Sequence, residues 1–375
     1  MRTIRFLKNC VVIAFVAAAC CFTVHAQSPS PNVHVWVSGL NGPRGLTFGP
    51  DGNLYVAEAG MGGSTSTAGA CPQVIPPIGP YLGGNTGQIS KIAPNGKRTI
   101  VAAGFPSSVA ATGDLSSVAD VAFVDGTLYA LVAGGGCSHG GSRPNGLYKV
   151  NLSNGSWSLV ANLSKFIQAH PVKYPNLPDF EPDGTFFSMT EFEHRLYAVE
   201  PNHGQIISIG TDGSMDAVLD VSASEGHIVP TSITSHDGQL YLGNLYLFPI
   251  QPTAARIMTL GRGECSQVSA PGLEDRGYSR DLHILNSKAG FTSVTGVAFG
   301  PDGLLYVLEL SDAAGFPTPG AGKVVRVNHD GSIEDVATGL VVPTGMTFGP
   351  HGKLYVSNFG AAPPGAGQIV QIDIP

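Results

Sequence analysis

The chain has 375 residues and a formal net charge of −7, and 43% of its residues are hydrophobic while only 13% are charged. This balance excludes a disordered chain, because disordered segments combine low hydrophobicity with high charge. The 50 glycines and 28 prolines exclude a helical bundle and favour short strands joined by many tight turns.

Residues 1–26 predict an export signal. Arg2, Arg5 and Lys8 precede an apolar run over residues 11–24. The residues that end at Ala26 are compatible with removal of the signal by cleavage. The run is too short to span a membrane, and no other segment resembles a membrane span. We therefore expect a periplasmic or secreted protein whose residues 27–375 form a single domain.

Lipid attachment at Cys20 is the alternative use of this signal. We favour cleavage after Ala26, because Ala17 occupies the position where a lipid-attachment signal usually has a large aliphatic residue. Cleavage removes three cations and no acids, so the net charge falls from −7 to −10. An acidic protein is a poor partner for nucleic acid or anionic membranes. We expect a monomer that binds neither and has no transmembrane segment.

A hairpin pattern then recurs six times. Residues 42–60 and 342–360 nearly coincide, and residues 294–311 match both. Weaker copies cover residues 118–135, 184–202 and 229–245. One tyrosine marks the same position in every copy: Tyr55, Tyr129, Tyr197, Tyr241, Tyr306 and Tyr355. The Pro-Asp-Gly triplets between the strands are explained by turn geometry, so we do not interpret them as calcium ligands.

Each hairpin is followed by a third strand, such as residues 87–92, and five of these lead into a fourth strand. The sixth unit lacks a fourth strand because the chain stops at Pro375. Residues 33–40 resemble the fourth strand at residues 335–340 and supply the missing one. The sequence thus predicts an all-β fold, a six-bladed propeller of four-stranded antiparallel blades whose last blade is completed by the N-terminal strand.

Propeller geometry places loops after second strands, and loops between blades, on one face. The long insertions all fall there: residues 59–86, 133–145, 164–183, 245–253 and 310–321. We call this the looped face. Long loops on a rigid scaffold are where binding usually occurs. The opposite face carries mostly tight turns, so the looped face is the candidate functional surface.

Oxygen-bearing side chains end most of the second strands, and we expect them to project near the central channel. Such side chains suit Ca²⁺ or Mg²⁺, and the metal-ligand candidates are Glu58, Glu200, Asn244 and Glu309. The alternative is that each satisfies backbone groups of an adjacent loop. The full set of ligand-binding candidates adds residues that begin first strands and one loop histidine. It consists of Arg44, Glu58, Asp120, Asp183, Glu200, His203, Asn244, Glu309 and Asn358.

Histidines and cysteines add weaker signals. His139, His203 and His227 lie near the looped face, but an exposed loop histidine without a role is the simpler interpretation of each. Cys71 and Cys137 occupy equivalent insertions of neighbouring blades, so a disulfide between them is sterically plausible, although the sequence leaves the pairing open. Cys265 falls on another blade and is expected to be free.

These loops also carry a family resemblance. The chain resembles the ScyD/ScyE proteins, first named from scytonemin pigment gene clusters, over nearly all of residues 27–375. The most specific segments are residues 180–185, 198–204, 229–232 and 316–320. The resemblance implies an exported propeller, and one family member is linked to late oxidative assembly of an indole–phenol dimer. The architecture is also similar to NHL-repeat proteins and to gluconolactonase-like hydrolases, which hold a divalent cation with acidic and Asn side chains.

Two hypotheses follow for function. The first is a propeller that binds a small molecule, glycan or protein on the looped face, with no cofactor assigned. The second is a Ca²⁺- or Mg²⁺-dependent enzyme at the channel mouth, either a lactone-type hydrolase or an oxidative enzyme acting on aromatic metabolites. The sequence carries no nucleophile motif, so the catalytic residues are unknown and the choice between enzyme and binding protein stays open.

Overall fold

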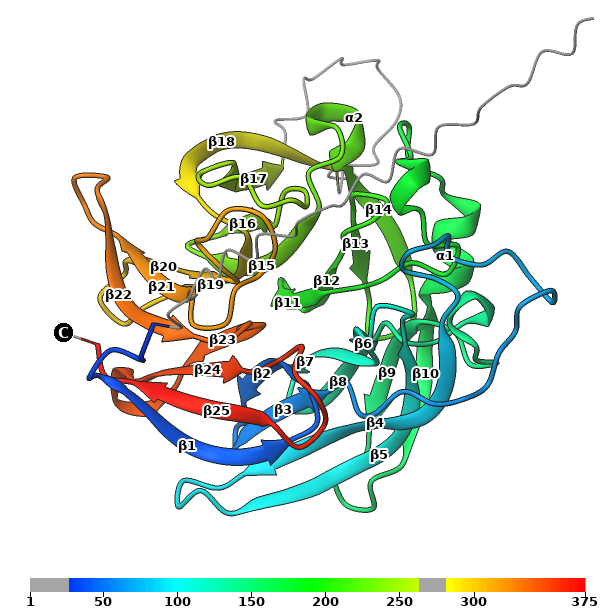
Figure 1. Cartoon of the computed structure of the whole chain (residues 1–375), viewed down its shortest axis with the longest axis horizontal. Helices are drawn as coiled ribbons and strands as arrows, with labels where there is room; N and C mark the ends of the chain where they lie inside the picture. Colours follow the sequence, from blue (N-terminus) through cyan, green and yellow to red (C-terminus); the bar gives the residue numbers. More distant parts are fainter. Residues whose placement is uncertain (1–26, 263–280, 375) are drawn as a thin grey trace, which may run out of the picture.

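The computed structural model describes residues 27–262 and 281–374. The predicted export signal and Cys265 therefore lie outside the described residues. Six antiparallel sheets form a ring (Figure 1), which confirms the predicted six-bladed propeller. Blade 1 contains β2 (Pro43–Phe48), β3 (Leu54–Glu58), β4 (Leu82–Ile92) and β5 (Arg98–Val109), with a short fifth strand, β6 (Leu115–Ser116).

The next four blades repeat the four-strand order from the channel outward. Their bounds are β7 (Val118–Val124), β8 (Thr127–Val132), β9 (Gly146–Val150) and β10 (Trp157–Asn162) in blade 2; β11 (Ser188–Phe192), β12 (Arg195–Glu200), β13 (Gln205–Ile209) and β14 (Met215–Asp220) in blade 3; β15 (Pro230–His236), β16 (Gln239–Asn244), β17 (Ala255–Arg262) and β18 (Leu282–Phe291) in blade 4; β19 (Val294–Phe299), β20 (Leu305–Glu309), β21 (Gly322–Val327) and β22 (Ile333–Leu340) in blade 5.

Blade 6 joins the two ends of the chain. It consists of β23 (Gly345–Phe348), β24 (Leu354–Asn358), β25 (Gly367–Ile372) and, on the outside, β1 (Val33–Leu40). β1 runs antiparallel to β25 from Val33 opposite Ile372 to Leu40 opposite Gly367. The predicted ring closure is therefore confirmed, and Figure 1 shows the blue β1 strand beside the red β25 strand.

Helical segments are few and short. They are α1 (Leu163–Ala169) and α2 (Val221–Glu225), with single 3₁₀ turns at Cys137–His139, Leu177–Asp179 and Pro350–Gly352. No helix within residues 27–262 or 281–374 is long and apolar enough to cross a membrane.

The core is divided among the contacts between neighbouring blades. Each of the six contacts has its own cluster of buried side chains; the cluster between blades 1 and 2, for example, contains Phe105 and Leu128. The repeated tyrosines belong to these clusters. The hydroxyls of Tyr55 and Tyr306 also donate to the turn carboxylates of Asp51 (3.0 Å) and Asp302 (2.8 Å). In these two hairpins the aspartate of Pro-Asp-Gly stabilises its own turn.

Candidate ligand site on the looped face

The oxygen-bearing residues at the ends of second strands hold the loops that enter their own blades. Four of them accept a hydrogen bond from a main-chain N–H some 15 to 17 residues earlier: Glu58 from Asn41 (2.8 Å), Glu200 from Thr185 (2.8 Å), Glu309 from Thr292 (2.8 Å) and Asn358 from Val341 (2.7 Å). Asn244 donates to the carbonyl of Ile228 (2.9 Å) and accepts from the N–H of Arg256 (2.8 Å). All five side chains therefore form hydrogen bonds with backbone groups, as the alternative interpretation of this set expected.

These hydrogen bonds direct the five side chains toward the loops beside them. None of the five lines either of the two cavities described below, because the second strand lies outside the innermost strand and its last side chain bonds the adjacent loop. Glu58 is fully buried and also forms an ion pair with Arg98 (2.7 Å). Among the described residues, no group of three His, Cys, Asp or Glu side chains is arranged to hold a metal ion. The donor set Glu58, Glu200, Asn244 and Glu309 does not fit a shared Ca²⁺ or Mg²⁺.

This arrangement gives an expected result for metal removal. We expect a chelator to leave the melting temperature unchanged, and Glu58→Gln to lower the unfolding free energy by about 3 kcal/mol, because the half-buried Arg98 guanidinium loses its charged partner. Denaturant unfolding and elemental analysis of the same samples measure both. Stoichiometric Ca²⁺ or Mg²⁺ that disappears in Glu58→Gln would contradict our interpretation of this residue.

Residues near the start of the first strands connect neighbouring blades around the channel. Thr231 donates to the carbonyl of Val294 (2.6 Å), Thr295 to that of Pro343 (3.0 Å), and Thr344 to that of Pro43 (2.7 Å). Each bond runs from one blade to the next, and the last one crosses from blade 6 to blade 1. These threonines thus support ring closure from the inside, where β1 supports it from the outside.

Asp120 provides the corresponding link between blades 2 and 3. Its carboxylate accepts from the N–H groups of Val121 and Met189, both at 2.8 Å. It also packs against the backbone of blade 1, where a Cβ at Gly45 would lie 1.8 Å from Asp120 Oδ1. Burial raises the pKa of Asp120 to about 7, even though the two backbone hydrogen bonds act in the opposite direction.

The raised pKa makes stability depend on pH. Because the folded protein keeps the proton on Asp120 up to pH 7 or so while the unfolded chain releases it near pH 4, the fold loses stability as pH rises between these values. We expect a loss of up to about 4 kcal/mol. Glu309, whose pKa burial also raises to about 7, contributes in the same direction. Asp120→Asn should flatten the profile measured by denaturant unfolding; an equally steep profile in the variant would contradict this assignment.

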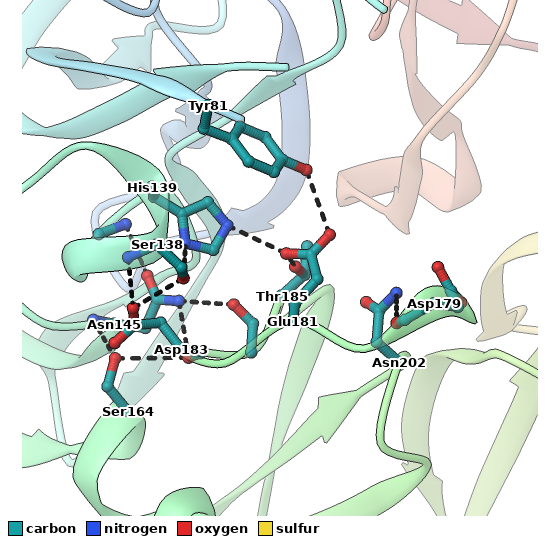
Figure 2. A network of polar contacts seen from close by, with 12 residues as sticks. Tyr81, Ser138, His139, Asn145, Ser164, Asp179, Glu181, Asp183, Thr185 and Asn202 are labelled. Carbon is teal, nitrogen blue, oxygen red and sulfur yellow. Dashed lines mark hydrogen bonds and ion pairs between the residues drawn. The ribbon is translucent and has the colours of Figure 1, made fainter. Parts of the chain in front are cut away.

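A buried network connects three long loops of the looped face (Figure 2). At its centre is the Glu181 carboxylate, which accepts from the Tyr81 hydroxyl (3.2 Å), His139 Nε2 (3.0 Å) and the Thr185 hydroxyl. Tyr81 comes from the insertion of blade 1, His139 from that of blade 2, and Glu181 from the segment that enters blade 3. Burial alone would raise the pKa of Glu181, but the contacts with His139, Thr185 and Tyr81 outweigh it and hold that pKa below its usual value.

A second carboxylate extends the network toward a disulfide. Asp183 accepts from the backbone N–H (2.8 Å) and hydroxyl (2.7 Å) of Ser138, as Figure 2 shows. Ser138 follows Cys137, and the structure joins Cys137 to Cys71 with an S–S distance of 2.12 Å. The pairing that the sequence left open is thus present in the structure. The disulfide and the two carboxylates fix the first two insertions against the segment that enters blade 3.

The histidines of this face are not the exposed loop residues that the simpler interpretation expected. His139 is fully buried, and His203 is 4% exposed. His203 Nε2 lies 3.0 Å from the Glu181 carbonyl, and the ring stacks on Phe180. His227 Nε2 lies 3.0 Å from the Asp179 carboxylate. All three therefore contact the segment over residues 179–181.

Two cavities lie against the first strands, around the axis of the ring. The larger, of about 360 Å³, is lined by the first strands of all six blades and includes Asp120. The smaller, of about 60 Å³, lies where those strands begin and therefore at the looped face; it is lined by Arg44, Leu115, Ser116, Ser117, Val118, Ala119, Ala133, Thr185, Phe186, Phe187 and Thr344. Of the predicted candidates, Arg44 lines the smaller of these two cavities and Asp120 the larger. Thr185 connects the smaller cavity to the Glu181 network.

Exposed aromatic side chains lie only on the looped face within the described part of the chain. Tyr174 (56% exposed), Phe248 (47%) and Phe316 (72%) come from three of its loops. Phe248 stacks on Phe316 with ring centroids 6.2 Å apart. Their loops are joined by backbone hydrogen bonds between Ile250 and Gly315. We call Tyr174, Leu177, Phe248 and Phe316 the apolar rim.

Comparisons with known proteins support the fold and leave the activity open. The sequence matches no family model and no curated protein, so the ScyD/ScyE resemblance stays a prediction. Solved structures with a similar fold include a gluconolactonase from Xanthomonas campestris (10% identity, TM-score 0.53, 92% of this chain and 89% of that chain). A PQQ-bound aldose sugar dehydrogenase from Streptomyces coelicolor has 13% identity, TM-score 0.53 and coverage of 93% and 99%. Regucalcin, a calcium-binding protein from Agrobacterium tumefaciens, has 14% identity, TM-score 0.51 and coverage of 91% and 93%.

Sequence reasoning missed the roles of Tyr81, His139 and Glu181. Glu181 lies in one of the segments that carry the family resemblance, so the sequence singled out the segment but gave Glu181 no function. Tyr81 lies outside every repeat, and its contact with Glu181 joins residues 100 positions apart. No local pattern encodes that pairing, because it depends on how two insertions fold over the ring.

Proposed function

We propose that the protein is an exported propeller that binds a small molecule at the channel mouth on its looped face. The observation that carries this proposal is the apolar rim. Exposed aromatic side chains gathered on one face of a rigid scaffold are typical of binding surfaces. The opposite face offers a comparison: Leu152, a large apolar side chain in the β9–β10 turn, is exposed there.

The buried network supports a binding role over catalysis. Glu181, His139 and Tyr81 resemble a set of catalytic groups by residue type, but none of them lines either of the two axial cavities. Their hydrogen bonds are made with one another, and their effect is to hold three loops in place. A surface whose loops are held before the ligand arrives loses less conformational entropy on binding.

The enzyme hypothesis receives separate, weaker support. Gluconolactonase and sugar dehydrogenase are among the propellers of similar fold, yet a shared fold does not transfer chemistry. The residues that we considered as metal ligands are engaged with backbone groups of their own blades. We therefore place binding first.

A capture experiment tests the proposal. Purified residues 27–375 are incubated with a metabolite extract and filtered, and the retained compounds are identified by mass spectrometry. We expect at least one compound to be retained by the wild type and lost in Phe248→Ser/Phe316→Ser. The matched control, Leu152→Ser on the opposite face, should retain it. Equal retention by the rim variant and the wild type would contradict binding at this face.

A further inference from the structure

Arg44 differs from the other described arginines in the partners of its guanidinium. Of the seven arginines in the described ranges 27–262 and 281–374, five form an ion pair with a carboxylate: Arg98, Arg195, Arg256, Arg262 and Arg326. Arg143 lies over the Trp157 ring at 4.5 Å. Arg44 has neither kind of partner among these residues. Its guanidinium donates one hydrogen bond, from Nη2 to the carbonyl of Leu115 (2.5 Å).

Arg44 is half-buried, so its cation is partly removed from water. The side chain lines the smaller cavity at the channel mouth. Burial lowers the pKa of Arg44 from its usual value, and attraction to Asp114 and Tyr81 offsets only part of this effect. The Asp114 carboxylate is exposed, and it lies beyond the 4.0 Å limit of an ion pair. A cation in such a place, with most of its N–H donors unused, is stabilised by an incoming anion.

The cavity also has the size and polarity for a small anionic group. Its volume of about 60 Å³ corresponds to about four water positions, which suits a carboxylate and excludes a whole sugar ring or a peptide. Hydroxyls of Ser116, Ser117, Thr185 and Thr344 are part of its lining. Three of them already donate to protein acceptors, Ser117 to Pro106, Thr185 to Glu181 and Thr344 to Pro43. Of these side chains, Arg44 and Ser116 keep donors that no described residue engages.

We propose that Arg44 binds the carboxylate of a small organic acid at the channel mouth. The planar guanidinium presents paired N–H donors that match the two oxygens of a carboxylate. This inference rests on the proposed function, because the acid would seat its charged end in a cavity on the same looped face that carries the apolar rim. It adds the substrate class: a compound with one apolar part and one carboxylate.

Benzoate and its neutral analogue benzamide test the inference. Calorimetric titration of residues 27–375 should give benzoate an affinity about tenfold or more above that of benzamide, as expected for one charge-assisted contact. Arg44→Gln should abolish the difference, and Arg44→Lys should restore part of it. Asp114→Asn, which removes a competing charge, should strengthen benzoate binding. Thermal unfolding of each variant checks that the ring is intact.

Four outcomes separate this inference from the proposed function. Equal affinity for the two probes, or benzoate binding unchanged in Arg44→Gln, would overturn the carboxylate site while leaving the looped face as a binding surface. Failure of benzoate to bind would likewise overturn the carboxylate site. Failure of the rim variant to alter compound retention would instead overturn the proposed function, whatever Arg44 does.

Discussion

A chain that lacks residues 28–40 should fail to form a stable ring. This deletion removes β1, whose backbone pairs along the whole of β25, and the fully buried Leu40 of the cluster between blades 6 and 1. It also removes Asn32, whose amide donates to the carbonyls of Val336 (2.9 Å) and Asp373 (3.0 Å). We expect a loss of more than about 5 kcal/mol, which matches the whole stability of many domains.

Point variants within β1 test whether the contacts of this strand, rather than the shortening of the chain, account for the loss of stability. Leu40→Ala should cost about 2–5 kcal/mol, because it empties a buried site. Val35→Ser should change stability little, because Val35 is 59% exposed on the outer strand. Circular dichroism and denaturant unfolding measure all three variants. Wild-type stability of the deleted chain would mean that the ring closes without β1.

Loss of the Cys71–Cys137 disulfide should be the second large effect. The two cysteines are 66 positions apart, and closing a loop of that length contributes about 4 kcal/mol by restricting the unfolded chain. Cys71→Ser/Cys137→Ser should therefore unfold at a clearly lower denaturant concentration. The wild type in reductant should match the variant, and reductant should not affect the variant further.

The disulfide variant should also loosen the network around Glu181. Ser138 and His139 follow Cys137 directly and contact Asp183 and Glu181. Without the disulfide, the hydrogens of these backbone amides should exchange faster, while those of β15 and β16 in blade 4 should not. Exchange that is unchanged around residues 137–139 would show that the two carboxylates hold this turn without the disulfide.

The ring was predictable because every part of it repeats. Tyr55 and Tyr355 occupy the same place in their blades, and the strand missing after Pro375 had an evident match at residues 33–40. Local pattern and global fold agree here, so short-range reasoning was enough.

The site was predictable only in part, because its contacts join insertions that do not repeat. Glu58 and Glu309 were correctly identified as polar strand ends, but the direction of their side chains depends on the adjacent loop. Arg44 was a candidate by its position at the start of a strand. Its lack of a carboxylate or aromatic partner becomes visible only when every other described arginine is seen to have one. The exposure of Phe248 and Phe316 on the same face could not be predicted from the sequence, because it depends on how their two loops fold.

Hydrogen–deuterium exchange with and without the compound retained by the protein tests most directly whether the looped face is the functional surface. We expect protection in the insertions over residues 59–86, 133–145, 245–253 and 310–321, and none in the opposite turns at residues 49–53 and 300–304. Protection confined to those turns, with the looped face unchanged, would contradict the proposed site.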